Sequence, residues 1–154
     1  MSLEHEVDLL RKIPIFAKIE PAKLKLLAFT SERISFDEGQ TLFFQGDGSD
    51  AAYVIIQGSA DVLVNTPNGE LSVAKLEKNA LVGEIGIFCD VPRTATVRAL
   101  TGIDTLRIEK RNFFQLLHEF PEMGAEIVRE LASRLAQTTS DLTQTRNELA
   151  ALKK

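Results

Sequence analysis

The sequence predicts a mainly β protein with flanking α-helices: a double-stranded β-helix, or jelly-roll, between N-terminal helices and one long C-terminal helix. Three observations lead to this fold class. Eight short segments between residues 33 and 108 alternate apolar and polar residues, which is the period of a half-buried strand. Glycine, proline and asparagine separate these segments at short intervals. The two ends of the chain show the spacing of amphipathic helices instead.

The chain begins with two predicted helices. Leu3, Val7 and Leu10 fall on one face of a helix over residues 3–12. Pro21 suits the first position of a second helix, which runs to about Thr30. The 154 residues are enough for one domain with a sizeable core. We expect an N-terminal helical segment (1–30), a β-roll (31–110) and C-terminal helices (111–154).

The predicted strands make up the middle of the chain. Asn68-Gly69 is the clearest hairpin turn between them, because both residues tolerate the positive φ angles of tight turns. Eight short strands with this spacing indicate a jelly-roll sandwich or barrel. The strands are predicted over residues 33–37, 40–45, 51–57, 59–64, 70–76, 80–82, 94–100 and 104–108.

The C-terminal region predicts a short helix over residues 111–118 and, after Phe120-Pro121, a long helix over residues 122–152. Apolar residues and threonines recur in the long helix at alternating steps of three and four, which is the pattern of a coiled-coil seam. A homodimer through this helix is therefore expected. The alternative is a helix packed on its own roll, because Met123 and Ile127 widen the apolar stripe. The seam positions are Val128, Leu131, Leu135, Thr138, Leu142, Thr145, Leu149 and Leu152.

The segment 82–98 has the features of an anion-binding site. Gly83 ends a strand and lets another molecule approach the backbone. The amides of residues 85–87, at a helix start bared by Gly86, offer donors to a phosphate. Arg93 brings a permanently charged fork of donors to the same place, and Glu84 suits a hydroxyl such as that of a sugar. The alternative is a glycine turn with a Glu84–Arg93 surface ion pair.

Residues 83–86 (Gly-Glu-Ile-Gly) and 92–97 (Pro-Arg-Thr-Ala-Thr-Val) resemble the phosphate-binding cassette of the cyclic-nucleotide-binding domain family. This family includes regulatory subunits of cAMP-dependent protein kinase, cyclic-nucleotide-gated channels and the bacterial catabolite activator protein. The resemblance implies that Gly83 and Glu84 hold the ribose 2′-hydroxyl. It also implies that the amides near Ile85 and Gly86 hold the cyclic phosphate and that Arg93 neutralises it.

The base of such a nucleotide needs an apolar surface, which Val62, Val64 or Val73 could supply by strand alternation. The resemblance implies that Thr94 adds a hydroxyl beside the phosphate or the base. Its place directly after Arg93 resembles channel cassettes and keeps cGMP open as a ligand. No catalytic residue, metal or cofactor is expected; the expected ligand is cAMP or, second, cGMP.

Residues 134–141 resemble the central helix of the catabolite activator protein. The resemblance implies that Thr138 contacts the base bound in its own chain and Thr139 the base in the partner subunit. It also implies that Arg134 lies near Glu84 as a counter-ion. Filling the pocket would then change how the helices pair. We prefer cAMP because the threonine pair suits an adenine amino group.

The resulting expectation is a cyclic nucleotide receptor, not an enzyme, that couples binding to movement or pairing of its C-terminal helix. One alternative is a structural dimerisation module with a non-binding cassette. Another is a cupin-like metalloenzyme, which the sequence disfavours because His5 and His118 lie on predicted helices, far from any strand. Cys89 has no paired thiol or histidine within its motif, so it is not expected to act as a nucleophile.

The remaining expectations concern location and partners. A net charge of −4 argues against a general nucleic-acid binder, and a single cysteine fits a reducing compartment. The sequence has no secretory h-region and no long apolar run, so a cytoplasmic location without a membrane span is expected. The chain ends at Lys154 without a helix-turn-helix, so direct DNA binding is not expected. The sequence identifies no downstream effector.

Overall fold

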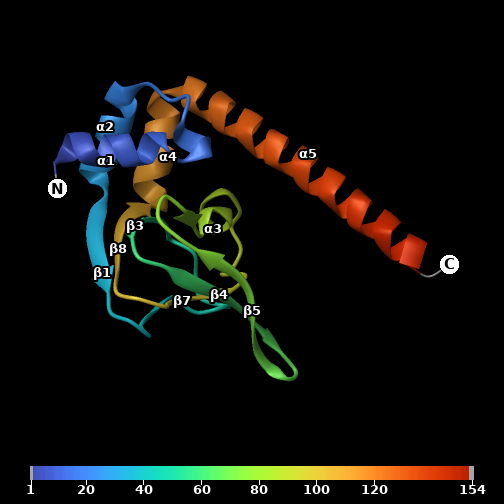
Figure 1. The fold of residues 1–154 in the computed structure, drawn as a ribbon. Coiled ribbons are helices and arrows are strands. Elements are labelled where there is room, and N and C mark those ends of the chain that lie inside the picture. Colours follow the sequence, from blue (N-terminus) through green and yellow to red (C-terminus); the bar gives the residue numbers. More distant parts are fainter. Residues whose placement is uncertain (1, 153–154) are drawn as a thin grey trace.

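The computed structural model describes residues 2–152, without the side chains of residues 85 and 86, as a β-roll that carries helices from both ends of the chain (Figure 1). The helices are α1 (Leu3–Arg11), the 3-10 helix η1 (Pro14–Phe16), α2 (Pro21–Thr30), α3 (Glu84–Phe88), α4 (Lys110–Glu119) and α5 (Pro121–Leu152). The strands are β1 (Glu32–Phe36), β2 (Thr41–Phe43), β3 (Ala51–Gln57), β4 (Ala60–Thr66), β5 (Gly69–Leu76), β6 (Leu81–Val82), β7 (Thr96–Ala99) and β8 (Ile103–Glu109).

The structure confirms the predicted fold class, and each predicted strand is present. The strands form two four-stranded antiparallel sheets, with the orders β1-β8-β3-β6 (sheet A) and β2-β7-β4-β5 (sheet B). Three predicted strands are shorter than expected: β6 by one residue, and β2 and β7 by more, because β2 ends at Phe43 and β7 begins at Thr96. At the ends of β2 and β7 the backbone N–H of Gln45 donates to the Thr96 hydroxyl (2.9 Å) instead of to a backbone carbonyl. The residues just before Thr96 are therefore free to line a site.

The hairpin between β4 and β5 turns one residue earlier than predicted. Thr66 pairs with Gly69, so the two-residue loop is Pro67-Asn68, and Gly69 is the first residue of β5. Gly69 has a φ of +104°, and the Thr66 hydroxyl donates to the Gly69 carbonyl oxygen (2.7 Å). The predicted position of the turn was wrong by one residue because the threonine side chain caps the loop. The hairpin extends from the roll in Figure 1.

Strand β3 belongs to two hydrophobic cores, because both of its faces are buried. Val54 and its even-numbered neighbours on β3 pack against the helices, in a core that includes Leu106, Ile108 and Phe113. Tyr53 and Ile55 face sheet B instead. Successive side chains of a strand point to opposite faces, so β3 lies between the helical core and the interior of the roll.

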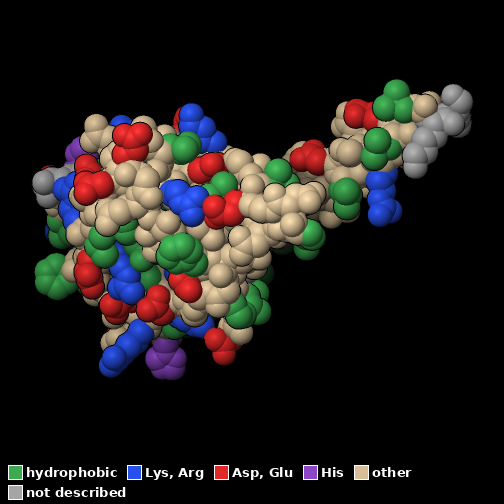
Figure 2. Space-filling model, turned by 90° about the horizontal axis from the view of Figure 1, so that it is seen from below, with side chains coloured by type: hydrophobic (Ala, Val, Ile, Leu, Met, Phe, Trp, Pro, Cys, Tyr) green, Lys and Arg blue, Asp and Glu red, His purple; other side chains and the backbone are tan. Residues whose placement is uncertain are grey.

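Helix α5 is buried only near its beginning. Met123 and Ile127 enter the helical core, and every described residue from 132 onward is exposed. In Figure 2 the second half of α5 extends away from the rest of the molecule. Val128, Leu135, Leu142 and Leu149, which are spaced seven residues apart, are between 52% and 68% exposed. Among residues 2–152, no helix combines the length and the apolar character that a membrane span requires.

Candidate ligand-binding site

A cavity of about 200 Å³ lies where the segment after β6 and the segment before β7 meet sheet B. Gly83, Glu84, Arg93 and Thr94, four of the residues predicted for the site, line this one cavity. The lining combines apolar side chains, here called the apolar wall, with polar groups. The apolar wall includes Phe43, Val62, Leu76, Leu81, Val82 and Val97. Of the three valines considered for an apolar surface, Val62 is the one that lines the cavity.

Arg93 is the most unusual residue of the cavity because it is charged and only 6% exposed. Its Nη1 donates to the Gly83 carbonyl (3.2 Å) and its Nη2 to the Ala51 carbonyl (2.5 Å). The guanidinium also lies over the Phe43 ring, 3.9 Å from the centroid, which is a cation–π contact. Its Nε is buried and has no hydrogen-bond partner among the described residues. The side chain is thus held by two hydrogen bonds and a cation–π contact, while its Nε donor stays without a partner in the described part of the chain.

The charge of Arg93 is not balanced by a carboxylate in contact with it. None of the ion pairs within 4.0 Å among the described residues includes Arg93. Burial lowers the pKa of Arg93, and Tyr53, Asp50 and Asp47 partly offset that effect. A guanidinium nevertheless stays protonated in proteins. A buried, unpaired cation beside a cavity favours binding of an anion there.

Gly83 is required by its own backbone and by Arg93. Its φ is +82°, a left-handed conformation that residues with a side chain rarely adopt. A Cβ built on Gly83 would fall well inside 3.0 Å of the Arg93 Nη1 atom, closer than real Cβ atoms come to a neighbour. The close approach of another molecule at Gly83 stays a prediction; in the structure the group close to Gly83 is the side chain of Arg93.

Glu84 is the first residue of α3 and forms an ion pair with Arg134 of α5. The distance from Arg134 Nη2 to Glu84 Oε1 is 3.2 Å. The Glu84 side chain is 19% exposed and that of Arg134 is 48% exposed. An ion pair with an exposed arginine contributes little to stability, about 0–1 kcal/mol. Its importance is positional, because it places α5 beside a residue that lines the cavity. The predicted proximity of these two residues is present; their contact with a ligand stays a prediction.

Four other predicted site residues are not placed in the cavity by the described structure. Ile85 and Gly86 lie within α3, and their predicted contacts fall outside what the structure describes. Thr138 and Thr139 are exposed on α5 and are not among the residues that line the cavity. The Thr138 hydroxyl donates to the Arg134 carbonyl of its own helix (2.9 Å). The contact of the threonines with a base stays a prediction.

Sequence reasoning missed Ser49, which also lines the cavity. Its hydroxyl oxygen is buried and has no hydrogen-bond partner among the described residues. The sequence signal was present but was interpreted only as a turn, since Ser49 directly follows Gly46-Asp47-Gly48. Phe43 was expected as a strand residue, and its contact with Arg93 could not be read from spacing.

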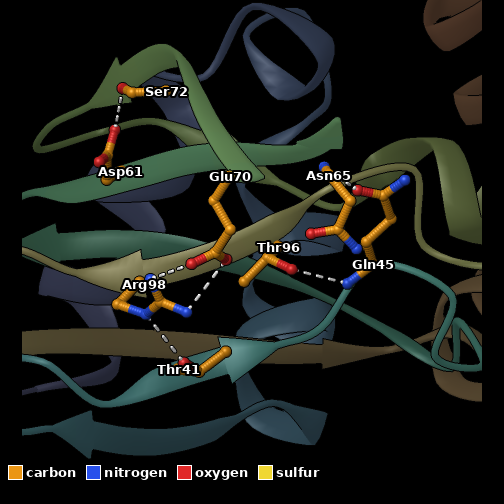
Figure 3. Close-up of polar contacts among 8 residues, drawn as sticks. All are labelled: Thr41, Gln45, Asp61, Asn65, Glu70, Ser72, Thr96 and Arg98. Atoms are coloured by element: carbon orange, nitrogen blue, oxygen red, sulfur yellow. Dashed lines mark hydrogen bonds and ion pairs between the residues drawn. The ribbon is translucent and has the colours of Figure 1, made fainter. Parts of the chain in front are cut away.

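Polar contacts hold sheet B in place beside the cavity (Figure 3). The Gln45 amide donates to the Thr96 hydroxyl, and the Gln45 side-chain oxygen accepts from the Asn65 amide (2.8 Å). Arg98 of β7 forms a bidentate ion pair with Glu70 of β5, in which Nη1 donates to Oε1 (3.1 Å) and Nη2 donates to Oε2 (3.2 Å). These contacts connect β4, β5 and β7 with the loop after β2, in the sheet that contributes Val62, Leu76 and Val97 to the apolar wall.

The histidines and the cysteine show no arrangement for metal chemistry. His5 lies on α1 and His118 on α4, and Cys89 is exposed. Among the residues that the structure describes, no group of three or more His, Cys, Asp or Glu side chains could hold a metal ion.

Comparison with known proteins gives one consistent result. The sequence model described as "Cyclic nucleotide-binding domain" matches residues 33–120. The chain is 26% identical, over 88% of its length, to the CRP-like cAMP-activated global transcriptional regulator of Mycobacterium tuberculosis. It is 30% identical, over 70% of its length, to a cAMP-dependent protein kinase regulatory subunit of Blastocladiella emersonii. The chain spans 61% of the first relative and 27% of the second, so it corresponds to a part of each.

A solved structure agrees over most of the chain. The N-terminal domain of a transcriptional regulator from Streptomyces coelicolor has a TM-score of 0.79 and 31% sequence identity. The match covers 86% of this chain and 96% of that domain.

Proposed function

Because the chain belongs to the cyclic nucleotide-binding domain family, we propose that it is a receptor for a cyclic nucleotide, with cAMP preferred over cGMP. We propose further that it performs no chemistry on its ligand and transmits occupancy through α5. The two relatives described above are named as regulators that respond to cAMP, which supports this direction.

The observation that carries the proposal is the state of Arg93. A buried guanidinium with an unpartnered Nε and no carboxylate in contact is costly unless an anion approaches it. The cyclic phosphate supplies that anion. Glu84 lines the same cavity and can accept a hydrogen bond from the ribose 2′-hydroxyl. The purine can lie on the apolar wall that includes Val62 and Leu76.

The link to α5 goes through Glu84. Its ion pair with Arg134 joins the cavity to a helix whose second half packs against no other described element. A ligand that engages Glu84 changes the electrostatic partner of Arg134 and with it the position of α5. The exposed residues at seven-residue spacing suit pairing with a second copy of α5, so we propose that the sensor works as a homodimer.

Titration calorimetry with cAMP and cGMP tests the proposal. The parent protein should bind cAMP more tightly than cGMP, and Arg93→Ala should lose about 2 kcal/mol or more of binding free energy, as expected for charge-assisted contacts to a phosphate. Arg98→Ala is the matched control. It removes an arginine of sheet B that pairs with Glu70 and does not line the cavity. Equal binding of cAMP by the parent protein and Arg93→Ala would show that the site assignment is wrong.

The exposed apolar residues of α5 favour a second candidate, a dimerisation module that binds no nucleotide. The two functions differ in a simple measurement. A receptor gains thermal stability as the concentration of nucleotide rises, whereas a purely structural module melts at the same temperature throughout.

A further inference from the structure

Ser49 lies in the loop between β2 and β3 and lines the same cavity as Arg93. Its Oγ atom is shielded from solvent and has no hydrogen-bond partner among the described residues. The Nε atom of Arg93 is in the same state. Buried side-chain polar atoms are nearly always paired in folded proteins. Two unpaired atoms that belong to residues of one cavity therefore point to a ligand that pairs with both.

The backbone fixes the loop that carries Ser49 against Arg93. The Gly46 amide donates to the Arg93 carbonyl (2.9 Å), and the Arg93 amide donates to the Asp47 carbonyl (2.8 Å). Two residues after Ser49, the Ala51 carbonyl accepts the hydrogen bond from Arg93 Nη2. Ser49 is thus held between two points at which the loop binds Arg93, and its position relative to the guanidinium is set by the fold.

We propose that Ser49 is a further ligand-contacting residue, whose hydroxyl donates a hydrogen bond to an exocyclic oxygen of the cyclic phosphate that Arg93 neutralises. The inference rests on the proposed function and adds a residue that determines affinity for the phosphate. The phosphate is the favoured partner because the loop of Ser49 is bonded to Arg93, whereas the sugar hydroxyls have an acceptor in Glu84. A hydroxyl hydrogen bond to a charged oxygen is among the stronger hydrogen bonds.

The first test compares the parent protein with Ser49→Ala by calorimetric titration of cAMP. Ser49→Ala should bind about tenfold more weakly, the loss expected for one hydrogen bond to a charged group. Ser35→Ala is the control. It also removes a serine hydroxyl, but from a residue of β1 that bonds to Asp104 and does not line the cavity. It should bind cAMP as the parent protein does.

The second measurement is thermal unfolding without nucleotide, and it separates a ligand contact from a structural role. Because the Ser49 hydroxyl has no partner in the protein, its removal should leave the midpoint unchanged or raise it. A hydroxyl that supports the fold would give a lower midpoint instead. Weaker binding together with equal or higher stability is the expected combination.

Phosphorothioate analogues of cAMP show which atom is contacted. Each of the two diastereomers replaces one exocyclic phosphate oxygen by sulfur, which is a weak hydrogen-bond acceptor. Ser49→Ala should lose about tenfold in affinity for the diastereomer that keeps the contacted oxygen and much less for the other one.

The possible results separate this inference from the proposed function. If the parent protein binds cAMP and Ser49→Ala binds it equally well, the inference is wrong and the proposed function stands. Equal losses for both diastereomers, or a lower unfolding midpoint without nucleotide, also overturn it. If the parent protein binds neither cAMP nor cGMP, the proposed function and this inference fall together.

Discussion

Gly83→Ala, which adds one methyl group, should leave the domain folded but weaken its binding of a ligand. Gly83 has a φ of +82°, and a residue with a Cβ costs about 1–2 kcal/mol in this left-handed conformation. That cost alone should lower the free energy of unfolding of Gly83→Ala by about the same amount. This loss of stability does not depend on a ligand.

The effect on binding comes from Arg93. Ordinary van der Waals contact with a Cβ begins at 3.4 Å, and the Cβ of Gly83→Ala would lie well inside that distance from Arg93 Nη1. The guanidinium must move, and its 3.2 Å hydrogen bond to the Gly83 carbonyl weakens. A displaced charged contact costs about 1.5–3 kcal/mol, so cAMP should bind roughly 10- to 100-fold more weakly.

Gly39→Ala is the matched control, because Gly39 has nearly the same φ, +84°, and nothing lies within 4 Å of its added Cβ. In urea unfolding, Gly39→Ala should therefore lose about the stability that the backbone conformation alone costs, and Gly83→Ala at least as much; only Gly83→Ala should lose affinity in calorimetry. If both variants bind cAMP as the parent protein does, the position of the Arg93 guanidinium does not determine binding, and the reasoning is refuted.

Three further predictions concern the core, the pH dependence and the assembly. Leu106→Ala should lower the free energy of unfolding in urea by about 2–5 kcal/mol, since this leucine of β8 is 1% exposed in the core shared by sheet A and the helices; a loss below about 0.5 kcal/mol, as for an exposed residue, would contradict that packing. Burial raises the pKa of Glu6 above 4.5, partly offset by Arg33, so its contribution favours folding below pH 4.5 and is lost as pH rises through the raised pKa. Glu6→Gln should consequently melt at a higher temperature than the parent protein at neutral pH and at a similar temperature below pH 4.5, and a lower neutral-pH midpoint would oppose this. Leu142→Asp should give a monomer in light scattering because it charges the exposed seam of α5, whereas Asn147→Asp, on the opposite side of the same helix, should not; an unchanged dimer of Leu142→Asp would move the interface elsewhere.

The strands could be predicted from the sequence because the apolar and β-branched residues that form them, and the turn residues that separate them, are local features. Residues 51–57 and 70–76 were predicted as strands from their own side chains, and β3 and β5 match them closely. The ends of β2 and β7 could not be predicted in this way. They depend on the bond between Gln45 and Thr96, which are far apart in the sequence.

The candidate site shows the same difference between features that are local in the sequence and features that are not. The cluster of Gly83, Glu84, Arg93 and Thr94 was predictable because these residues lie within twelve positions of one another and carry a recognisable pattern. The partners that hold Arg93 were not predictable, since the Ala51 carbonyl belongs to β3 and offers no side-chain signal. A hydrogen bond to a backbone carbonyl cannot be predicted from the spacing of residue types, because every residue has such a carbonyl.

The balance of charges around the cavity bears on which phosphate the domain selects. Glu84 is neutralised by Arg134, and Arg93 is left with one positive charge that no contacting carboxylate balances. A cyclic phosphodiester carries one negative charge, which balances the single charge of Arg93. A phosphate monoester carries about −1.5 to −2 at neutral pH. Its second negative charge would have no further cation to pair with among the described residues that line the cavity, because Arg93 is the one arginine or lysine there. We therefore expect the domain to bind a cyclic nucleotide more tightly than the corresponding linear one, because Arg93 balances a single negative charge.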